Sequence, residues 1–586
     1  MAFAGEWDKL LNAVRRSVGT FDASPPDPAL FDPRQALDYL RLRCLPWSRR
    51  GDHLVYGSWD VRRAEADLRS RHAVDGRSFE VRYCRRATLE THVARLGQRT
   101  LVHEAVEGLR SRDASLSAHR PLRGHGPWLV ALGLGLVALA IAAPTVAIGL
   151  AVAGSAAVAA FRSALLAAGL GARATLPEAG DLPTVTLLVP LRDEEAILPR
   201  LVEHLRALDY PRRLLEVLLL VEEDDPDTAR AARRLRLPPG FRVLTVPTGG
   251  PATKPKAMQY ALPFTAGAII GIYDAEDRPA RDQLRKVAGA LGAAGPEVGG
   301  VQARLNFDHG DRDALARCAC AEYAVWFDAM LPGLARLGLP VPLGGTSIFV
   351  RRGALEAAGG WDPRNVTEDA DLGIRLARAG YRVPLIDSTT HEEPIRDVGA
   401  WVKQRSRWVK GFMVTLLVLL RDPRRVRREM GTLPALAAAL LLADGAFSFL
   451  VGPLGWAILF GGLVWGGVSW WLLAPLGLAQ AALLGAAFVA TRRRFGARRA
   501  LWALALPIYW LLGLASALLA LRELASDPAG WAKTPHGHVE AGLRRRPVFA
   551  RYRRCQKAPA PRRPRSAWSA SAAPRPSSTR SASSRG

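Results

Sequence analysis

Cysteine is scarce in this sequence, and the first residues contain no apolar run. Only five cysteines occur among 586 residues, and no two of them have C-x-x-C spacing. An odd number without metal-ligand spacing excludes the common zinc sites and a secreted disulfide framework, so it favours a reducing cytosolic compartment. The first 25 residues carry charges throughout. We therefore expect no signal peptide.

Acidic residues are absent from the last part of the chain. Residues 541–586 contain thirteen Lys or Arg and no Asp or Glu, which is half of the formal net charge of +26. The same segment is rich in Ser, Pro and Ala, so it cannot bury enough apolar surface to offset the entropy of ordering. We predict a disordered basic tail. Anionic lipid headgroups suffice as its partner, and no nucleic-acid partner is expected.

Charged side chains are also absent from residues 127–161, where nearly every residue is Leu, Ala, Val, Ile or Gly. Pro144 divides this segment into two stretches of 17 residues, each roughly 26 Å long as a helix, which is close to the thickness of a bilayer core. We predict two transmembrane helices within 127–171. One tilted helix with a proline kink is the alternative.

Two further apolar blocks, 433–490 and 501–521, are separated by an arginine-rich loop at 491–499. Their lengths predict three or four transmembrane helices. We favour three short spans in the first block, with breaks near Pro453 and Ser469. By the positive-inside rule this arrangement puts the loop outside and the basic tail inside, and two spans would reverse the sides.

The soluble parts of the chain are predicted to be residues 1–126 and 172–430. An even number of predicted spans lies between them, so both belong on the same side of the membrane. The basic segment 421–428 precedes the second apolar block and marks that side as cytoplasmic.

The second soluble part has the pattern of a parallel sheet. Apolar runs at 184–191 and 215–221 have the length of strands, and apolar residues between 197 and 208 recur at helical spacing. Strand, helix and strand form a βαβ unit, and ligands of such sheets bind beyond the carboxyl ends of the strands. A third strand is predicted at 268–273. All three strands are followed by acidic clusters, at 192–195, 222–225 and 274–277.

The acidic cluster after the third strand has the features of a cation site. Alternation along an extended chain points Asp274 and Glu276 to the same side, within reach of one hard cation such as Mg²⁺ or Mn²⁺. A single acidic loop would be weak support, but three clusters at three successive strand ends favour a site. Lys254 and Lys256 precede the third strand. They could pair with phosphates or lie on a surface loop.

Two later segments add charge near the second apolar block. Residues 365–372 open an amphipathic helix with Thr367 as its N-cap, and the acids that follow could merely complement the helix dipole. The segment Gln404-Arg-Ser-Arg-Trp408 could be an interfacial helix anchored by Trp and Arg.

The motifs of this region occur in a characteristic order: VPLRDEE, VEEDD, TKPKA, DAED, GGTS, TEDADLG and QRSRW. Together with the flanking apolar blocks, they resemble the membrane-integrated family 2 glycosyltransferases of the bacterial cellulose synthase-like group, over residues 180–540. The resemblance implies an α/β GT-A (Rossmann-like) catalytic domain embedded between transmembrane α-helices. It also implies an inverting transferase that uses a nucleotide sugar, usually a UDP sugar, and Mg²⁺ or Mn²⁺.

The resemblance also assigns roles to residues. Asp369, in the Thr-Glu-Asp motif with Glu368, corresponds to the catalytic base. The nucleotide sugar would be held by Glu194, Asp224, Asp225, Lys256 and Asp274. The metal would be bound by Asp274 with either Glu276 or Asp277, since Glu276 stands where the family has Asp. The acceptor and the diphosphate would contact Gly345, Thr346, Gln404, Arg407 and Trp408. Residues 526–540 resemble a loop that covers the active site in relatives.

The N-terminal part is predicted to be a separate small α/β module. Helical spacing around residues 36–40 alternates with strand-like runs at 53–56 and 79–83. The pattern resembles the N-terminal domain of type II secretion ATPases. Because there is no Walker motif, we expect a binding or regulatory module, with export or secretion partners.

These features lead to one main hypothesis and two alternatives. We expect a synthase of a β-linked polysaccharide in the inner (plasma) membrane of a bacterial cell, with its catalytic domain in the cytoplasm. The alternatives are transfer of a single sugar to a lipid carrier and a non-catalytic membrane scaffold. The expected partners are a nucleotide sugar, a glycan or lipid-linked acceptor, and membrane lipids. The predicted boundaries are 1–126, 127–171, 172–430, 431–525, 526–540 and 541–586.

Overall fold

The computed structural model describes residues 25–530, except for 76–77, 123–130, 132, 136–137, 140, 171–179, 309, 311, 467 and 529. The predicted basic tail at 541–586 and most of the predicted loop at 526–540 lie outside the described residues. The same holds for much of the first predicted span.

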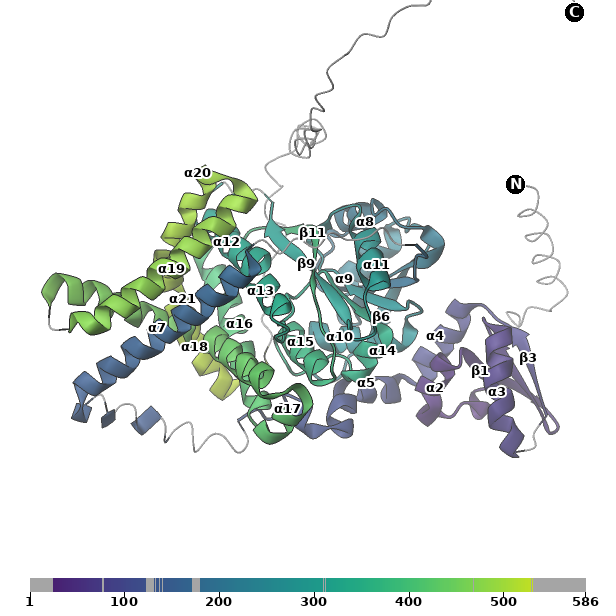
Figure 1. The fold of residues 1–586 in the computed structure, drawn as a ribbon. Helices are drawn as coiled ribbons and strands as arrows, with labels where there is room; N and C mark the ends of the chain where they lie inside the picture. The colour runs from purple at the N-terminus through teal and green to yellow at the C-terminus, as the bar shows by residue number, and fades with distance from the viewer. Residues whose placement is uncertain are drawn as a thin grey trace, which may run out of the picture. The chain divides into compact units, whose positions relative to one another are not determined.

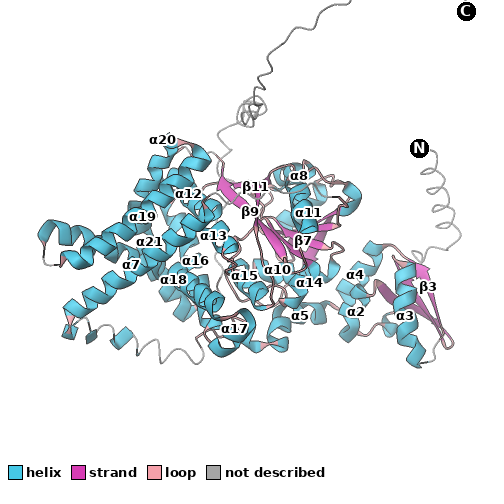
Figure 2. Ribbon diagram, viewed as in Figure 1, coloured by secondary structure: helices cyan, strands magenta, loops and turns pink. Residues whose placement is uncertain are grey.

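The N-terminal module contains a three-stranded sheet covered by helices, as predicted (Figure 2). Strand β2 lies in the middle, antiparallel to β1 and parallel to β3. The strands are β1 (Cys44–Arg50), β2 (His53–Ser58) and β3 (Phe79–Tyr83). The helices are α2 (Ala36–Arg41), α3 (Val61–Asp75), α4 (Arg86–Leu96) and α5 (Gln98–Arg112), with short 3-10 turns at Pro28–Leu30, Pro33–Gln35 and Ala114–Leu116.

The predicted catalytic domain, residues 172–430, is built on an eight-stranded mixed sheet in the order β6-β5-β4-β7-β10-β9-β11-β8. Strands β6, β5, β4 and β7 are parallel, β10 is antiparallel to both of its neighbours, and β11 runs parallel to β9. The strands are β4 (Val185–Leu191), β5 (Leu215–Glu222), β6 (Phe241–Val246), β7 (Ile269–Ile272), β8 (Arg278–Pro279), β9 (Gly300–Phe307), β10 (Ile348–Arg351) and β11 (Leu385–Glu392). This is a GT-A-like mixed sheet, and the predicted fold class is confirmed.

The central strands are apolar because both of their faces are covered. Leu188 and Leu218 belong to a core cluster that includes Met258 of α10. Their neighbours Leu187 and Val217 belong to another cluster, shared with residues of α8 and α11 on the opposite face. Alternate side chains of one strand therefore serve two helix layers, and the strands appear in the sequence as continuous apolar runs.

Helices and short turns connect the strands and extend the domain. They are α8 (Leu198–Arg206), η5 (Arg212–Leu214), α9 (Pro226–Arg234), α10 (Lys254–Ala261), η6 (Leu262–Phe264), α11 (Gln283–Ala293), α12 (Ala314–Val325), the π-helical turn η7 (Trp326–Met330), α13 (Leu331–Arg336), α14 (Arg352–Ala357), α15 (Glu368–Arg378), α16 (Val398–Leu419) and α17 (Pro423–Met430). Helix α16, which was predicted as a possible interfacial helix, is buried along much of its length.

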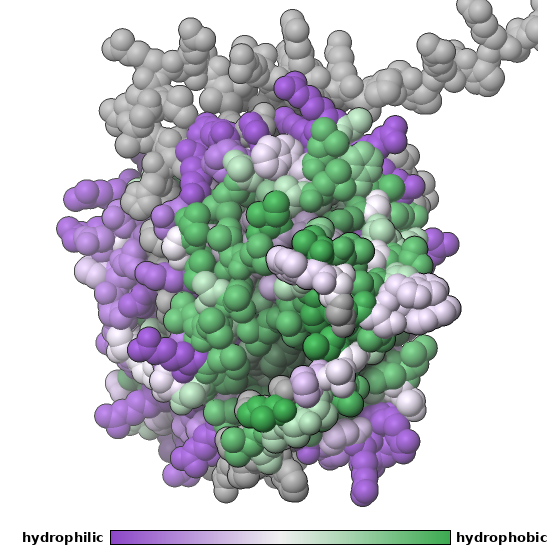
Figure 3. All heavy atoms as spheres, turned by 90° about the vertical axis from the view of Figure 1, so that its left-hand side faces the viewer, coloured by the Kyte–Doolittle hydropathy of each residue, from purple (hydrophilic) through white to green (hydrophobic). Residues whose placement is uncertain are grey.

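Within the described residues, four helical segments are long and apolar enough to cross a membrane. They lie together beside the catalytic sheet (Figure 1). They are α7 (Pro144–Gly169), α18 (Thr432–Trp465), α19 (Trp470–Phe495) and the segment Ala497–Ser526, which comprises α20 (Ala497–Ala500), η8 (Leu501–Ala505) and α21 (Leu506–Ser526). Seen from their far side, these helices present a face covered mostly by apolar residues, with hydrophilic residues at its margins (Figure 3).

The favoured division of 433–490 into three short spans is wrong. The helix α18 continues through Pro453, and only the break at Ser469 is present. A proline removes one backbone N–H, and in an apolar helix packed against neighbours the chain tolerates this loss. Pro144 instead begins α7, because Ala143 has non-helical backbone angles. The alternative of one helix kinked at this proline is not tested, because many of the residues before it lie outside the described part of the chain.

The arginine-rich end of α19 lies against the catalytic domain. Arg494 Nη1 is 3.2 Å from Asp328 Oδ1, and its Nη2 donates a 2.9 Å hydrogen bond to Thr389 Oγ1 of β11. The expectation that this loop lies on the side of the membrane away from the catalytic domain is therefore wrong, because two helices rather than three precede it.

Helix α7 packs closely on the catalytic domain through two glycines. A Cβ atom on Gly169 would come within 1.8 Å of the Ala329 carbonyl oxygen, and one on Gly333 within 2.0 Å of the Leu165 carbonyl oxygen. Only glycine allows backbones to approach this closely. The end of α7 is thereby fixed to η7 and α13.

Candidate active site

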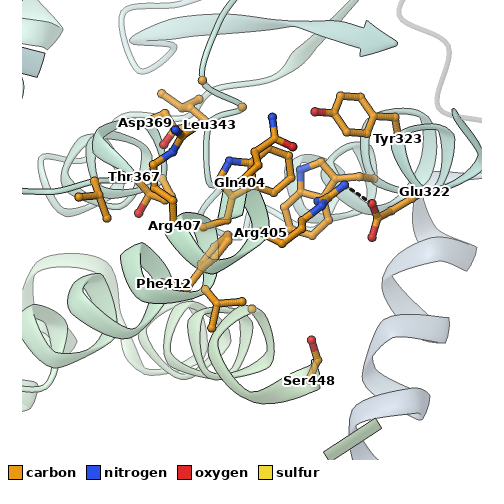
Figure 4. Close-up of a pocket in the computed structure, with 18 of the residues that line it drawn as sticks. Glu322, Tyr323, Leu343, Thr367, Asp369, Gln404, Arg405, Arg407, Phe412 and Ser448 are labelled. Carbon is orange, nitrogen blue, oxygen red and sulfur yellow. Dashed lines mark hydrogen bonds and ion pairs between the residues drawn. The ribbon is translucent and has the colours of Figure 1, made fainter. Parts of the chain in front are cut away.

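A cavity of about 570 Å³ begins at the carboxyl ends of β4, β5 and β7 and continues between the apolar helices. Figure 4 shows Thr367, Asp369 and Arg407 at one end of the view and Glu322 and Tyr323 at the other, with Ser448 apart from both groups. Of the residues predicted from the sequence, the cavity brings together Glu194, Asp274, Glu276, Gly345, Thr346, Glu368, Asp369, Gln404, Arg407 and Trp408.

The turn after β7 aims Asp274 into the cavity. The backbone N–H of Asp274 donates a 2.8 Å hydrogen bond to Asp277 Oδ2, and the hydroxyl of Thr346 donates to the same oxygen. Asp277 is fully buried and does not line the cavity, whereas Glu276 does. Of the two candidates for the second metal carboxylate, the geometry favours Glu276 and gives Asp277 a structural role.

Lys254 is the cation of this acidic site. Its Nζ lies 2.5 Å from Asp274 Oδ1 and 3.8 Å from Glu368 Oε1, and it donates a 2.8 Å hydrogen bond to the Gly345 carbonyl oxygen. Burial alone would lower the pKa of Lys254, but the carboxylates of Asp274 and Glu368 outweigh this effect and raise it. The predicted clusters at 274–277 and 365–372 therefore meet around one ammonium group.

The first turn of α15 carries the candidate base. Thr367 occupies the N-cap position, but its side chain makes no capping hydrogen bond. Its backbone N–H donates a 3.1 Å hydrogen bond to Asn365 Oδ1. Burial raises the pKa of Asp369 to about 6 and that of Glu368 to about 8, and Lys254 opposes both shifts. Near neutral pH, Asp369 is thus the carboxylate of this pair that is ready to accept a proton.

Glu392, at the end of β11, is a site residue that the sequence reasoning missed. It lines the cavity, and burial together with Asp277, Glu276 and Asp274 raises its pKa well above the ordinary value. Burial and Asp274 also raise the pKa of Glu276 to about 7. Glu392 is more than 100 residues from Asp274 and Glu276 in the sequence, so no local pattern predicts that it lies near them.

The carboxylates of the site fit a divalent cation that arrives with a diphosphate. Among the residues that the structure describes, no three His, Cys, Asp or Glu side chains are close enough to hold a metal by themselves. Asp274 and Glu276 nevertheless face the same cavity. Mg²⁺ is commonly bound by one or two carboxylates, with substrate phosphates completing its shell.

The predicted nucleotide residues separate into two groups. Glu194 lines the cavity, and so does Arg192, whose guanidinium is 3.0 Å from the half-exposed Asp224. Asp225 does not line the cavity but accepts a 2.7 Å hydrogen bond from the Asp193 N–H and one of 3.1 Å from the Thr228 N–H. Asp224 and Asp225 therefore shape the loop and do not face the cavity.

Lys256 also points away from the cavity. It is 1% exposed, and its Nζ is 3.0 Å from Glu222 Oε2 and 2.6 Å from the Pro247 carbonyl oxygen. The predicted phosphate contact of Lys256 is at odds with this burial. Lys254, the other lysine of the motif, faces the site.

Helix α16 supplies the opposite wall, with Gln404, Arg407 and Trp408 all facing the cavity. Burial lowers the pKa of Arg407, opposed by the carboxylates of Glu368, Asp274 and Asp369. The guanidinium of Arg405 stacks 4.0 Å from the centre of the Trp408 ring.

Glu322 of α12 holds this wall in position, a role the sequence analysis did not predict. It pairs with Arg405, accepts a 3.2 Å hydrogen bond from Tyr509 Oη and accepts one of 3.1 Å from Trp510 Nε1 (Figure 4 draws the Arg405 pair). One carboxylate thus joins α12, α16 and α21.

Part of the chain is similar to known proteins. Residues 269–520 match the family model described as "Glycosyl transferase family group 2". A beta-monoglucosyldiacylglycerol synthase of Trichormus variabilis is 31% identical over 239 residues, which are 40% of this chain and 49% of the relative. Cellulose synthase 1 of Komagataeibacter xylinus is 28% identical over 248 residues, covering 40% of this chain and 15% of that one.

Among solved structures, the mannosyltransferase PcManGT from Pyrobaculum calidifontis, in complex with GDP-Man and Mn²⁺, has 21% identity and a TM-score of 0.41. The match covers 64% of this chain and 98% of that one. The chain spans about half the length of the glucolipid synthase it matches. The matched region, residues 269–520, contains strands β7 to β11 of the sheet and most of the apolar helices after it.

Proposed function

We propose that this protein is a membrane-bound glycosyltransferase that moves one sugar from a nucleotide sugar to the hydroxyl group of a lipid. The observation that carries the proposal is the cavity itself. It joins the acidic site around Asp274 and Asp369 to a space lined by apolar helices. A polar donor and an apolar acceptor can therefore meet in one continuous pocket.

In the proposed reaction, Asp369 takes the proton of the acceptor hydroxyl as the oxygen attacks the anomeric carbon. The bond from that carbon to the diphosphate breaks, and the nucleoside diphosphate leaves with both electrons. A single displacement inverts the anomeric configuration. Lys254 and Arg407 face the site and would offset the negative charge of the leaving group.

A divalent cation, Mg²⁺ or Mn²⁺, would be held by Asp274 and Glu276 and would supply further charge for the diphosphate. The electrostatics of the neighbouring carboxyl groups support this assignment. Burial and Asp274 raise the pKa of Glu276, and burial together with Asp277, Glu276 and Asp274 raises that of Glu392, so a bound cation would relieve repulsion within the cluster.

A lipid acceptor has more support than the polysaccharide expected from the sequence. The name of the relative from Trichormus variabilis refers to a diacylglycerol bearing one glucose, and it matches with higher identity than cellulose synthase 1, of which only 15% is covered. We therefore prefer the single-transfer alternative. The non-catalytic scaffold is disfavoured, because a scaffold has no need for a buried base, a lysine and an arginine around one cavity.

We further propose that the N-terminal module and the catalytic domain share one side of the membrane. Arg242 pairs with both Glu90 of α4 and Glu216 of β5, with Nη2 2.7 Å from Glu216 Oε1. Helix α7 lies between the two domains in the chain, so they can touch on one side of the membrane only if the chain crosses the membrane an even number of times between them. The apolar residues before Pro144 would form the second crossing. We also propose that this shared side is the cytoplasmic side of the inner membrane, because the basic segment 421–428 lies just before α18.

The N-terminal module is proposed to act as a binding or regulatory module on the catalytic domain. Its helix α5 packs on α10, which begins with the site residue Lys254. Arg364, three residues before Thr367, donates a 2.7 Å hydrogen bond to the Val106 carbonyl oxygen of α5. A partner bound to this module, such as an export or secretion protein, would therefore act close to the site.

The test is a transfer assay with purified protein in lipid nanodiscs. Radiolabelled UDP-glucose, UDP-galactose, UDP-N-acetylglucosamine and GDP-mannose are each offered with dioleoylglycerol, undecaprenyl phosphate or a cello-oligosaccharide. We expect a glycosyl-diacylglycerol product that disappears in Asp369→Asn and persists in Asp227→Asn, an exposed aspartate of α9. Product found only in the oligosaccharide or lipid-phosphate arms would refute the proposal.

A further inference from the structure

The deeper part of the cavity lies between the apolar helices and carries its own polar groups. Its lining includes Ser155 and Arg162 of α7, Asp444 and Ser448 of α18, and Gln480 of α19. In Figure 4, Ser448 lies away from the side chains around Asp369. The catalytic chemistry described above uses none of these residues.

This part of the cavity reaches the outer apolar surface. Leu440 and Phe447 of α18 line the cavity and are also 47% and 38% exposed. They lie on the same side of α18 as Asp444, at spacings of four and three residues. A molecule in the surrounding lipid can thus reach the polar groups from the side, without passing through water.

The polar groups in this space are only partly satisfied. Arg162 Nε donates a 2.8 Å hydrogen bond to Asp444 Oδ2, and this is the one hydrogen bond that Arg162 makes with the described residues. Asp444 is 6% exposed and Ser155 is 3% exposed. Within the described part of the chain, Asp444 Oδ1 and Ser155 Oγ have no hydrogen-bond partner. Buried polar atoms normally have partners, so these two unpaired atoms mark the space as a candidate binding site.

The helices also converge closely around these atoms. A Cβ atom on Gly455 of α18 would lie 2.9 Å from Ser155 Oγ and 3.9 Å from Gln480 Nε2. Ser155 and Arg162 are seven residues apart, so they lie on one face of α7, roughly 10 Å apart along its axis. The space therefore has donors at two depths and an unpaired, buried acceptor at Asp444.

We propose that this space binds the glycerol part of a neutral diacyl lipid, which reaches it between α7 and α18. The inference rests on the proposed function and names the acceptor subsite. The free N–H groups of Arg162 and the hydroxyl of Ser155 donate to the ester carbonyl oxygens, and Asp444 Oδ1 accepts from the free hydroxyl of the lipid before it moves to Asp369. The acyl chains remain among Leu440, Phe447 and the surrounding lipid.

The charge of the subsite selects against a lipid phosphate. Arg162 is already paired with Asp444, so the two side chains together carry no net charge. A phosphate placed here would be buried beside a carboxylate without a compensating cation, which is unfavourable in an apolar environment. A neutral ester and hydroxyl incur no such penalty.

Gly452 offers a way to block this subsite without disturbing the fold. It lines the cavity, and a Cβ atom added there meets nothing within 4 Å. Gly452→Phe therefore fills the open space. Gly485→Phe in α19 is the matched control, because that position is also free of contacts within 4 Å, is exposed, and lies outside the cavity lining.

The experiment uses the full-length protein in nanodiscs that contain a diacylglycerol with a photoactivatable acyl chain. After illumination, labelled peptides are mapped by mass spectrometry, and UDP binding to the same samples is measured by calorimetry. We expect labelling of α7 and α18 peptides near residues 155 and 452. It should fall at least fivefold in Gly452→Phe and in the charge-free double variant Arg162→Leu/Asp444→Leu. Gly485→Phe should label like the wild type, and UDP binding should be unchanged in all variants.

Equal labelling of Gly452→Phe and Gly485→Phe would overturn the inference, as would labelling confined to the outer surface. Competition by phosphatidic acid that is stronger than competition by unlabelled diacylglycerol would overturn it in favour of a lipid phosphate. Displacement by a cello-oligosaccharide would overturn it in favour of a glycan. The labelling needs no nucleotide sugar, so a protein that labels as expected but transfers no sugar would support the subsite and refute the proposed function.

Discussion

The pH dependence of catalysis tests the assignment of Asp369 as the base. A base must be deprotonated to accept a proton, and burial raises the pKa of Asp369 from an ordinary 3.8 to about 6. The raised pKa means that activity should be lost as the pH falls through about 6. An exposed aspartate would lose its base function only near pH 4.

The size of the effect follows from the two pKa values. At pH 5, a carboxyl group of pKa about 6 is roughly one-tenth deprotonated, whereas one of pKa 3.8 is more than nine-tenths deprotonated. We therefore expect kcat/KM at pH 5 to be about tenfold below its plateau. The kcat/KM profile is the appropriate measure because it reports the groups of the free enzyme, which is the state described by the structure.

Two neighbouring substitutions distinguish the base from its surroundings. Asp369→Asn removes the base and should reduce kcat/KM by roughly a hundredfold or more. Glu368→Gln makes a similar change one residue away, but the pKa of Glu368 is about 8, so its side chain is already mostly neutral at pH 7. This variant should keep activity within a few fold at that pH. A profile that stays flat to pH 5, or equal losses in the two variants, would refute the assignment.

Four further predictions concern the site and its surroundings. Lys256→Met leaves the buried carboxylate of Glu222 unpaired and should lower the free energy of unfolding by roughly 3–5 kcal/mol in denaturant titrations. Lys254→Met should instead weaken UDP binding about tenfold in calorimetry, because a charge-assisted hydrogen bond to the diphosphate is lost. Arg494→Gln removes one cation from Asp328 and should speed hydrogen exchange at the end of α19. Chelation of divalent cations should abolish transfer, and added Mg²⁺ or Mn²⁺ should restore it; unchanged transfer in EDTA would contradict the metal assignment.

Much of the catalytic sheet could be predicted because its signals are local. The strands β4, β5 and β7 are apolar runs that need no knowledge of distant residues, and parallel strands bring their carboxyl ends to one edge. For this reason the acidic clusters could be expected to form a site. The meeting of Asp274 and Glu368 at Lys254 agrees with that expectation.

The orientation of the two lysines could not be predicted, because it depends on where α10 begins. The helix starts at Lys254, and residues two apart on a helix point in nearly opposite directions. Lys254 therefore faces the cavity, and Lys256 faces Glu222 in the interior. The sequence motif is the same whichever lysine faces the ligand.

The apolar helices illustrate a similar limit. Hydropathy identifies their residues, but whether Pro453 ends a helix depends on the packing around it, which the sequence does not express. Likewise, Arg162 and Asp444 are separated by 282 residues, and only the packing of α7 against α18 makes them a pair.

The sequence by itself determined the strand-forming runs, the acidic residues that follow them and the length of the apolar segments, because these depend on neighbours within one element. The tertiary structure decided which carboxylates share a cation, which lysine faces the cavity and how far the cavity extends between the helices. Those outcomes depend on contacts between elements that are far apart in the chain, where small rotations of a helix exchange an exposed group for a buried one.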